Sequence, residues 1–85
     1  MRHLEFEPDA FAEFAWWIKQ NRKVALRIVK LLNDVQRDPF DGIGKPEPLK
    51  HNLSGAWSRR IDKEHRLVYI VTDETIRIVS CRWHY

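Results

Sequence analysis

The sequence is poor in cysteine and glycine, and several kinds of functional motif are absent from it. Its one cysteine, Cys81, excludes an internal disulfide and a cysteine-based zinc site. No Cys or His residues are paired at metal-ligand spacing, no glycine-rich phosphate loop occurs, and no serine lies in a nucleophile elbow. If the chain is an enzyme, we therefore expect acid–base chemistry without a metal or a cofactor.

Long apolar runs and targeting segments are absent as well. The apolar stretches, such as FAWWI, are far shorter than a membrane span. The first residues, MRHLEFEPD, include acids where a signal peptide has its apolar core. Together with a lone free thiol, this predicts a cytoplasmic protein without a membrane partner. The 85 residues, 44% of them hydrophobic, suffice for a single domain over 1–85.

Charge is unevenly distributed along the chain. Lys and Arg number 15 against 12 Asp and Glu, a net charge of +3. The first 15 positions are rich in acids, whereas basic side chains gather later, at Lys45, Lys50, His51, Arg59, Arg60, Lys63, His65, Arg77, Arg82 and His84. This pattern fits a polyanion site on one face. It fits an ordinary solvated basic surface equally well, and charge alone does not separate the two.

Apolar periodicity and turn residues predict an α+β fold. RHLEF alternates like a short strand, and Pro8 suits the start of a helix that runs to about Gln20 on an apolar stripe of Phe11, Phe14, Ala15 and Ile18. Asn21 is a plausible cap for a second helix, which Pro39 ends. After a loop over 40–48, the runs WSRRI, RLVYIV and TIRIVSCRW form an antiparallel meander. We expect two N-terminal helices packed on a mainly antiparallel twisted sheet, with basic residues on its open face.

Two charged residues lie in rigid surroundings. Glu47 stands between two prolines in KPEPLKHN, so its backbone is stiff, which suits a general base and equally a surface carboxylate in a rigid turn. Arg66 begins an apolar strand and is either an edge-of-strand cation or a phosphate ligand. The adjacent Arg59 and Arg60 must point to opposite faces of their strand, so only one of them is expected to contact the basic surface.

The segment CRWHY places a titratable side chain among aromatic ones. His84 is flanked by Trp83 and Tyr85, and it could donate a proton near neutrality or simply belong to an aromatic cluster that packs on a helix. A strict two-residue turn at Asp73-Glu74 would set Arg66 opposite Cys81. A bulge would then be needed to bring Arg66 and His84 to one face.

These residues together suit metal-free cleavage of RNA. The reaction requires a base for the 2′-hydroxyl, an acid for the 5′-oxygen and a cation for the phosphorane. Glu47, His84 and Arg66 could supply these three functions in that order. DNA lacks the 2′-hydroxyl, so this chemistry would be specific for RNA.

The motifs KPEPLKHNLSGAWSRRI, EHRLVYIV and CRWHY resemble the YoeB/Txe toxins of bacterial type II toxin–antitoxin systems, within the RelE-like superfamily. The resemblance implies a microbial-RNase-like fold and an mRNA interferase that cuts translated mRNA in the ribosomal A site. It implies general base Glu47, general acid His84, transition-state stabiliser Arg66 and orienting or stacking Tyr85. It also implies RNA contacts at Lys50, His51, Arg59, Arg60 and Trp83. Trp83 stands where the family often has Tyr, which could shift base preference.

The resemblance also implies partners, and two other functions remain open. The implied partners are mRNA, the ribosome with its rRNA, a YefM-like antitoxin and a second copy in a homodimer. The first alternative is a non-catalytic RNA- or ribosome-binding module that uses the same basic face. The second is an interaction protein that pairs through Trp16 and Trp17, which lie about 100° apart on a helix and so either reach an interface or widen the core stripe.

Overall fold

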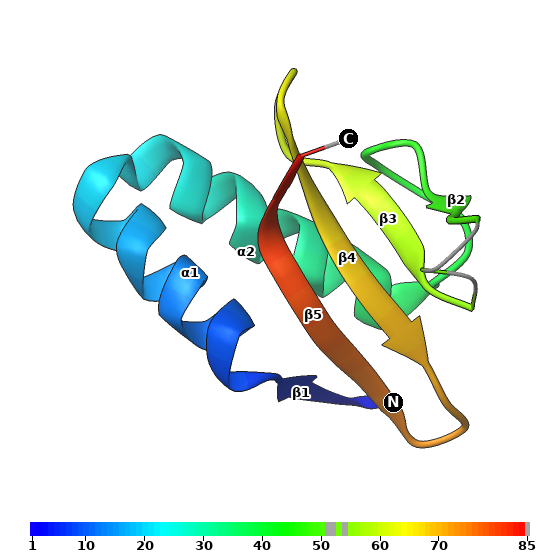
Figure 1. The fold of residues 1–85 in the computed structure, drawn as a ribbon. Coiled ribbons are helices and arrows are strands. Elements are labelled where there is room, and N and C mark those ends of the chain that lie inside the picture. The colour runs from blue at the N-terminus through cyan, green and yellow to red at the C-terminus, as the bar shows by residue number, and fades with distance from the viewer. Residues whose placement is uncertain (51–52, 54, 85) are drawn as a thin grey trace.

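Two helices cover one face of a five-stranded sheet in the computed structural model, which describes residues 1–50, 53 and 55–84, with only the backbone of His84 (Figure 1). The elements are β1 (His3–Phe6), α1 (Pro8–Gln20), α2 (Arg22–Arg37), β2 (Glu47–Pro48), β3 (Trp57–Arg60), β4 (His65–Val71) and β5 (Thr75–His84). The strand order is β1-β5-β4-β3-β2, and every pair is antiparallel except β1 with β5. The predicted α+β fold is confirmed.

The helix boundaries follow the local signals in the sequence. Pro8 is the first residue of α1, where a missing N–H costs nothing. The side chain of Asn21 caps α2 by accepting a hydrogen bond from the backbone N–H of Val24 at 3.3 Å. α2 ends at Arg37, two residues before Pro39. Among the described residues, no helix combines the length and the apolar character needed to cross a bilayer.

The main core lies between the helices and the sheet. α2 buries an apolar stripe, with Ile28, Leu31 and Val35 fully enclosed. The stripe predicted for α1 is wrong in part, because Ala10 and Trp17 are its buried residues while Phe11 and Ile18 are 62% and 49% exposed. The face that α1 turns inward is the one that contacts β5, and the spacing of large side chains did not reveal it.

A second, smaller apolar cluster lies apart from the main core. It consists of Leu49, Ala56 and Val68, with Leu53, Ile70, Val79 and Trp83 packed against it. Leu49 and Ala56 flank the connection from β2 to β3, and the backbone N–H of Leu49 donates to the carbonyl of Ala56 at 2.9 Å. The sheet face away from the helices is therefore partly covered and only partly open, unlike the open face that was predicted.

Candidate active site

Glu47 and Arg66, which were singled out in the sequence, are in direct contact. Arg66 Nη1 donates to Glu47 Oε1 at 2.7 Å and to Ser58 Oγ at 3.0 Å. Arg66 is only 7% exposed, whereas the carboxylate-bearing side chain of Glu47 is 45% exposed. The Arg66 guanidinium is therefore bound on its buried side by the Ser58 hydroxyl and on its solvent side by the Glu47 carboxylate.

Three strands bring these groups together. Glu47 pairs with Ser58 across β2 and β3, and Ser58 pairs with Val68 across β3 and β4. Directly opposed residues of antiparallel strands share a face, so Glu47 and Ser58 reach Arg66 from neighbouring positions. The sequence analysis missed Ser58. Strand alternation puts Ser58 on the same face as Arg60 and opposite to Arg59, but it does not say which of these faces is turned away from the helices.

Arg59 was predicted to contact RNA, and the structure overturns this. Its side chain is completely buried, and its guanidinium donates to Asp34 Oδ2 at 2.6 Å and to the carbonyl of Ile43 at 3.1 Å. It also donates to the carbonyl oxygens of Asp38 and Asp41 and to the hydroxyl of Tyr69. A buried cation needs this many acceptors to offset its lost hydration. Arg59 is therefore a structural residue that faces the helices.

The contacts of Arg59 hold the loop that leads to Glu47. The Asp34 carboxylate accepts from the backbone N–H of Ile43 at 2.9 Å as well as from Arg59. Gly42 has a φ of +137°, and a Cβ at this position would overlap the carboxylate of Asp34. The backbone N–H of Arg60 donates to the carbonyl of Gly44 at 2.7 Å. The sequence analysis attributed the placement of Glu47 to the stiffness of the flanking prolines alone. The hydrogen bonds around Arg59 and Asp34 are a second cause.

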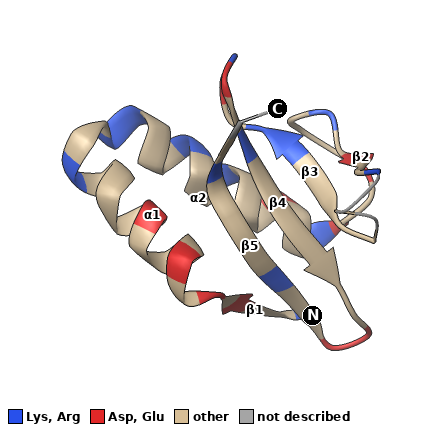
Figure 2. Cartoon of the chain, viewed as in Figure 1, with Lys and Arg blue, Asp and Glu red and all other residues tan. Residues whose placement is uncertain are grey.

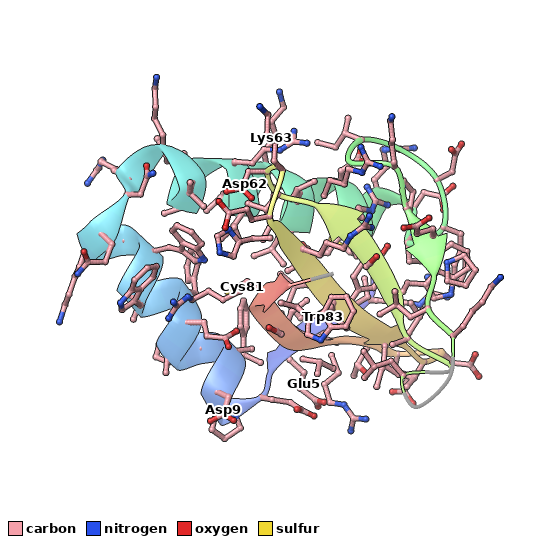
Figure 3. All side chains as sticks on the ribbon, turned by 45° about the horizontal axis from the view of Figure 1, so that its top comes forward. Glu5, Asp9, Asp62, Lys63, Cys81 and Trp83 are labelled. Atoms are coloured by element: carbon pink, nitrogen blue, oxygen red, sulfur yellow. The ribbon has the colours of Figure 1, made fainter. Side chains whose placement is uncertain are left out.

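Two exposed cations extend the site along one end of the sheet. Arg60, Lys63 and Arg66 line a pocket of about 390 Å³ together with Asp62. Asp62 and Lys63 lie on the connection between β3 and β4 (Figure 3). Burial acts to raise the pKa of Asp62, but the backbone N–H groups of His65 and Glu64 lower it below its ordinary value. Lys50, also predicted to contact RNA, is exposed two residues after β2 and lies away from this pocket, beyond the start of β3.

Acidic and basic residues are unevenly distributed over the fold. Figure 2 shows acidic residues on β1 and on the first half of α1, and basic residues at the end of β3 near the end of β5. The uneven distribution predicted from the sequence is therefore also a spatial one. A polyanion would be attracted to the β3 end, where the pocket lies.

β5 brings its last residues beside Arg66. Trp83 is the register partner of Arg66, and His84 is the partner of His65. A bulge was expected to bring Arg66 and His84 to one face, but the register shifts twice, so Trp83 and not His84 lies directly opposite Arg66. The Trp83 side chain packs against the cluster of Leu49, Ala56 and Val68. The side chain of His84 and the predicted site residues His51 and Tyr85 lie outside the described residues, so their roles remain predictions.

The described residues can be examined for metal ligands and for a reactive thiol. Among them, no group of three or more His, Cys, Asp or Glu side chains could hold a metal ion. Burial raises the pKa of Cys81 to about 12, with a smaller contribution from the charge of Glu13. This thiol is protonated at neutral pH and is not poised to act as a nucleophile.

Known proteins of one family resemble this chain in sequence and in fold. A family model described as the YoeB-like toxin of bacterial type II toxin–antitoxin systems matches residues 6–85. Toxin RelK of Mycobacterium tuberculosis is 54% identical over 85 residues, the full length of both chains. The YoeB dimer of Staphylococcus aureus superposes with a TM-score of 0.92 at 45% identity, over 99% of this chain and 98% of the other. A YoeB-YefM complex from the same organism matches with a TM-score of 0.89 at 45% identity, over 100% and 99%.

Proposed function

Because the chain belongs to the YoeB-like toxins of bacterial type II toxin–antitoxin systems, we propose that it is a ribosome-dependent mRNA endoribonuclease. The observation that carries the proposal is the contact of Arg66 with Glu47, which joins a phosphate-binding cation to a half-exposed carboxylate beside the end of β5. Cutting mRNA in the ribosomal A site would stop translation, which is the effect expected of such a toxin.

The proposed reaction is an in-line transfer from the 2′-hydroxyl. Glu47 accepts the 2′-hydroxyl proton, and the 2′-oxygen attacks the adjacent phosphorus. Arg66 stabilises the added negative charge of the phosphorane. His84 donates a proton to the departing 5′-oxygen as its bond to phosphorus breaks. The products are a 2′,3′-cyclic phosphate on one fragment and a 5′-hydroxyl on the other.

The contact between Glu47 and Arg66 must be weakened by the substrate before Glu47 can act as a base. Glu47 and Arg66 neutralise each other at 2.7 Å in the free protein. A phosphate that approaches Arg66 competes with Glu47 for the guanidinium, because both are anionic acceptors. The competition would release Glu47 to take a proton, while Ser58 keeps the guanidinium in place from its buried side.

RNA is proposed to enter over the basic end of the sheet. Arg60 and Lys63 are exposed there, and Lys50 is exposed beyond the opposite end of β3. All three could bind backbone phosphates. Trp83 and, by the family resemblance, His51 and Tyr85 are proposed to stack on or orient nucleotides. The buried Arg59 is not part of this surface.

The proposed partners follow from the same family. A homodimer is proposed because the related S. aureus YoeB was solved as a dimer. A YefM-like antitoxin is proposed as the neutralising partner because another S. aureus structure is a YoeB-YefM complex. We also propose that the protein acts in the cytoplasm, where its mRNA and ribosome targets are found.

Mapping of mRNA ends during induced expression tests the proposed activity. Wild type is expected to produce new ends within translated mRNA, with 2′,3′-cyclic phosphates. Glu47→Gln and His84→Gln are expected to lower cleavage by at least 100-fold while ribosome binding persists. Glu74→Gln and His3→Gln change the same residue types at exposed positions and should cut normally.

The alternatives give different outcomes in the same experiment. Translation inhibition without new mRNA ends, unchanged in both site variants, would favour a non-catalytic ribosome-binding module. Normal cutting by Glu47→Gln and His84→Gln would contradict the assigned roles. Recovery of only 5′-phosphate and 3′-hydroxyl ends would contradict attack by the 2′-hydroxyl.

A further inference from the structure

The register between β4 and β5 shifts twice, and the shifts decide what lies beside Arg66. Near the turn the strands run in step, with Val71 opposite Ile76 and Tyr69 opposite Ile78. If this register continued, Arg66 would face Cys81. The observed partner of Arg66 is Trp83, two residues further along β5. Two residues of a strand span about 6–7 Å. Relative to Arg66, the shifts therefore move the end of β5 toward the β4–β5 turn by about that length.

The second shift is a bulge at Cys81 and Arg82. Val68 pairs with Ser80 and Arg66 with Trp83, so two residues of β5 lie opposite the single residue Leu67 of β4. A bulge leaves backbone groups without ladder partners, and such groups are costly when they are buried. Cys81 is completely buried, so its backbone needs other partners.

Side chains of α1 supply these partners. The backbone N–H of Cys81 donates to Glu13 Oε1 at 2.9 Å, and the carbonyl of Cys81 accepts from Trp17 Nε1 at 2.8 Å. Ser80 Oγ donates to the same Glu13 oxygen at 3.0 Å and accepts from the N–H of Arg82 at 3.2 Å. Figure 3 shows Cys81 at the edge of β5 beside α1.

The two consecutive tryptophans of α1 complete the contact with this part of the sheet. The ring of Trp17 meets the ring of His65 edge-on, with centroids 4.9 Å apart. The guanidinium of Arg82 lies 3.6 Å from the centre of the Trp16 ring. Trp16 thus contacts β5, and Trp17 contacts both β4 and β5. His65 is the register partner of His84.

We propose that Glu13 and Trp17 are positioning residues for the active site. They hold the β5 bulge at Cys81 and thereby the register that sets Trp83 opposite Arg66 and His84 opposite His65. The inference rests on the proposed function, because the end of β5 matters for catalysis only if its residues act there. The hydrogen bonds of Glu13 and Trp17 go to Ser80 and Cys81 of β5, so we infer that they act through this strand.

We call the hydrogen bonds from Glu13 and Trp17 to β5 the clamp, and two substitutions remove it in different ways. Glu13→Leu removes the acceptor for Cys81 and Ser80, whereas Glu13→Gln keeps an acceptor oxygen and only removes the charge. Trp17→Phe keeps an aromatic ring and removes the N–H donor. Asn21→Ala is the matched control for stability, because it removes the α2 cap and leaves β5 untouched.

Single-turnover cleavage on programmed ribosomes measures the effect. Glu13→Leu and Trp17→Phe are expected to cut about 10- to 100-fold more slowly, because displacement of a reacting group by an ångström has this effect. Their ribosome affinity should stay within about twofold of wild type, and Glu13→Gln and Asn21→Ala should cut within a few-fold of wild type. If folded Glu13→Leu and Trp17→Phe both cut at the wild-type rate, the inference is overturned.

Backbone nuclear Overhauser contacts test the register without any cleavage. Wild type should show cross-strand contacts between Arg66 and Trp83. Glu13→Leu should weaken them in favour of contacts between Arg66 and Arg82, because loss of the bulge at Cys81 alone shifts the register by one residue. Unchanged contacts in both clamp variants would overturn the inference. If wild type cuts no mRNA, the proposed function fails, and the clamp is still confirmed or refuted by these contacts. Should Glu13→Leu not fold, Trp17→Phe decides.

Discussion

Replacement of Asp34 by Asn tests whether the buried guanidinium of Arg59 organises the fold. Asp34 Oδ2 lies 2.6 Å from Arg59 Nη1, and the Arg59 side chain is completely buried. Asp34→Asn keeps the shape of the side chain and one acceptor oxygen but removes the negative charge. The guanidinium would then be buried with neutral acceptors only.

The expected loss of stability can be worked from this geometry. Breaking a buried ion pair from one side costs about 3–5 kcal/mol, and the retained acceptor places this variant near the lower value, about 3 kcal/mol. A domain of this size loses about 4–8 °C in Tm for each kcal/mol, so Tm should fall by about 12–24 °C. The loss is large against the 5–15 kcal/mol that is usual for folded domains.

Urea unfolding at pH 7, followed by tryptophan fluorescence, measures the free energy of unfolding. Asp73→Asn makes the same chemical change at an exposed turn position and should stay within about 0.5 kcal/mol of wild type. A loss below about 1 kcal/mol for Asp34→Asn would refute the reasoning. It would mean that the backbone carbonyls around Arg59 stabilise its charge without the carboxylate.

The difference in unfolding free energy between wild type and Asp34→Asn is expected to depend on pH. Hydrogen bonding from Arg37, the backbone N–H of Ile43 and Arg59 holds the pKa of Asp34 well below its usual range. The unfolded state therefore binds a proton at a pH where the native state does not, so this stabilisation is complete above about pH 5 and declines as the pH falls below about 3.9. The gap between wild type and Asp34→Asn should narrow from pH 5 to pH 3, and a constant gap would contradict the assignment.

Two further predictions concern the charged surface and the buried thiol. Arg60→Gln should weaken ribosome binding and reduce the slope of log affinity against log salt by about 1. Its free energy of unfolding should stay within about 0.5 kcal/mol of wild type. Equal ribosome affinities for Arg60→Gln and for the exposed Arg22→Gln would show that Arg60 does not contact RNA. Cys81 is fully buried with its pKa raised to about 12, so a thiol reagent at pH 8 should label the native protein at least about 100-fold more slowly than the urea-unfolded chain. Equal labelling rates would show that α1 opens readily from β5.

Short-range signals in the sequence were sufficient for the helices and for part of the site. Pro8 and Asn21 mark helix starts because their effects involve only the next few residues. Glu47 and Arg66 stood out through proline stiffness, strand position and family motifs, and the structure brings them into contact at 2.7 Å. Their catalytic roles remain proposals.

Strand alternation left one question that only long-range contacts could answer. It required Arg59 and Arg60 to point to opposite faces but did not say which one is buried. The answer depends on Asp34, which lies 25 positions earlier in the chain and accepts from Arg59 on the helix side of the sheet. The parallel pairing of β1 with the first half of β5 likewise joins strands that are far apart in the sequence, and no short-range pattern predicts it.

The sequence by itself determined the fold class, the helix boundaries and the candidate pair of Glu47 and Arg66. Tertiary structure decided the register of β5. The turn at its start predicted Cys81 opposite Arg66, and the observed partner is Trp83. Two shifts separate these registers, and the physical reason for the second is that the Cys81 backbone finds its partners in Glu13 and Trp17, 68 and 64 positions away in sequence. No short-range pattern encodes a hydrogen bond of that separation, so only the packing of α1 on the sheet could reveal it.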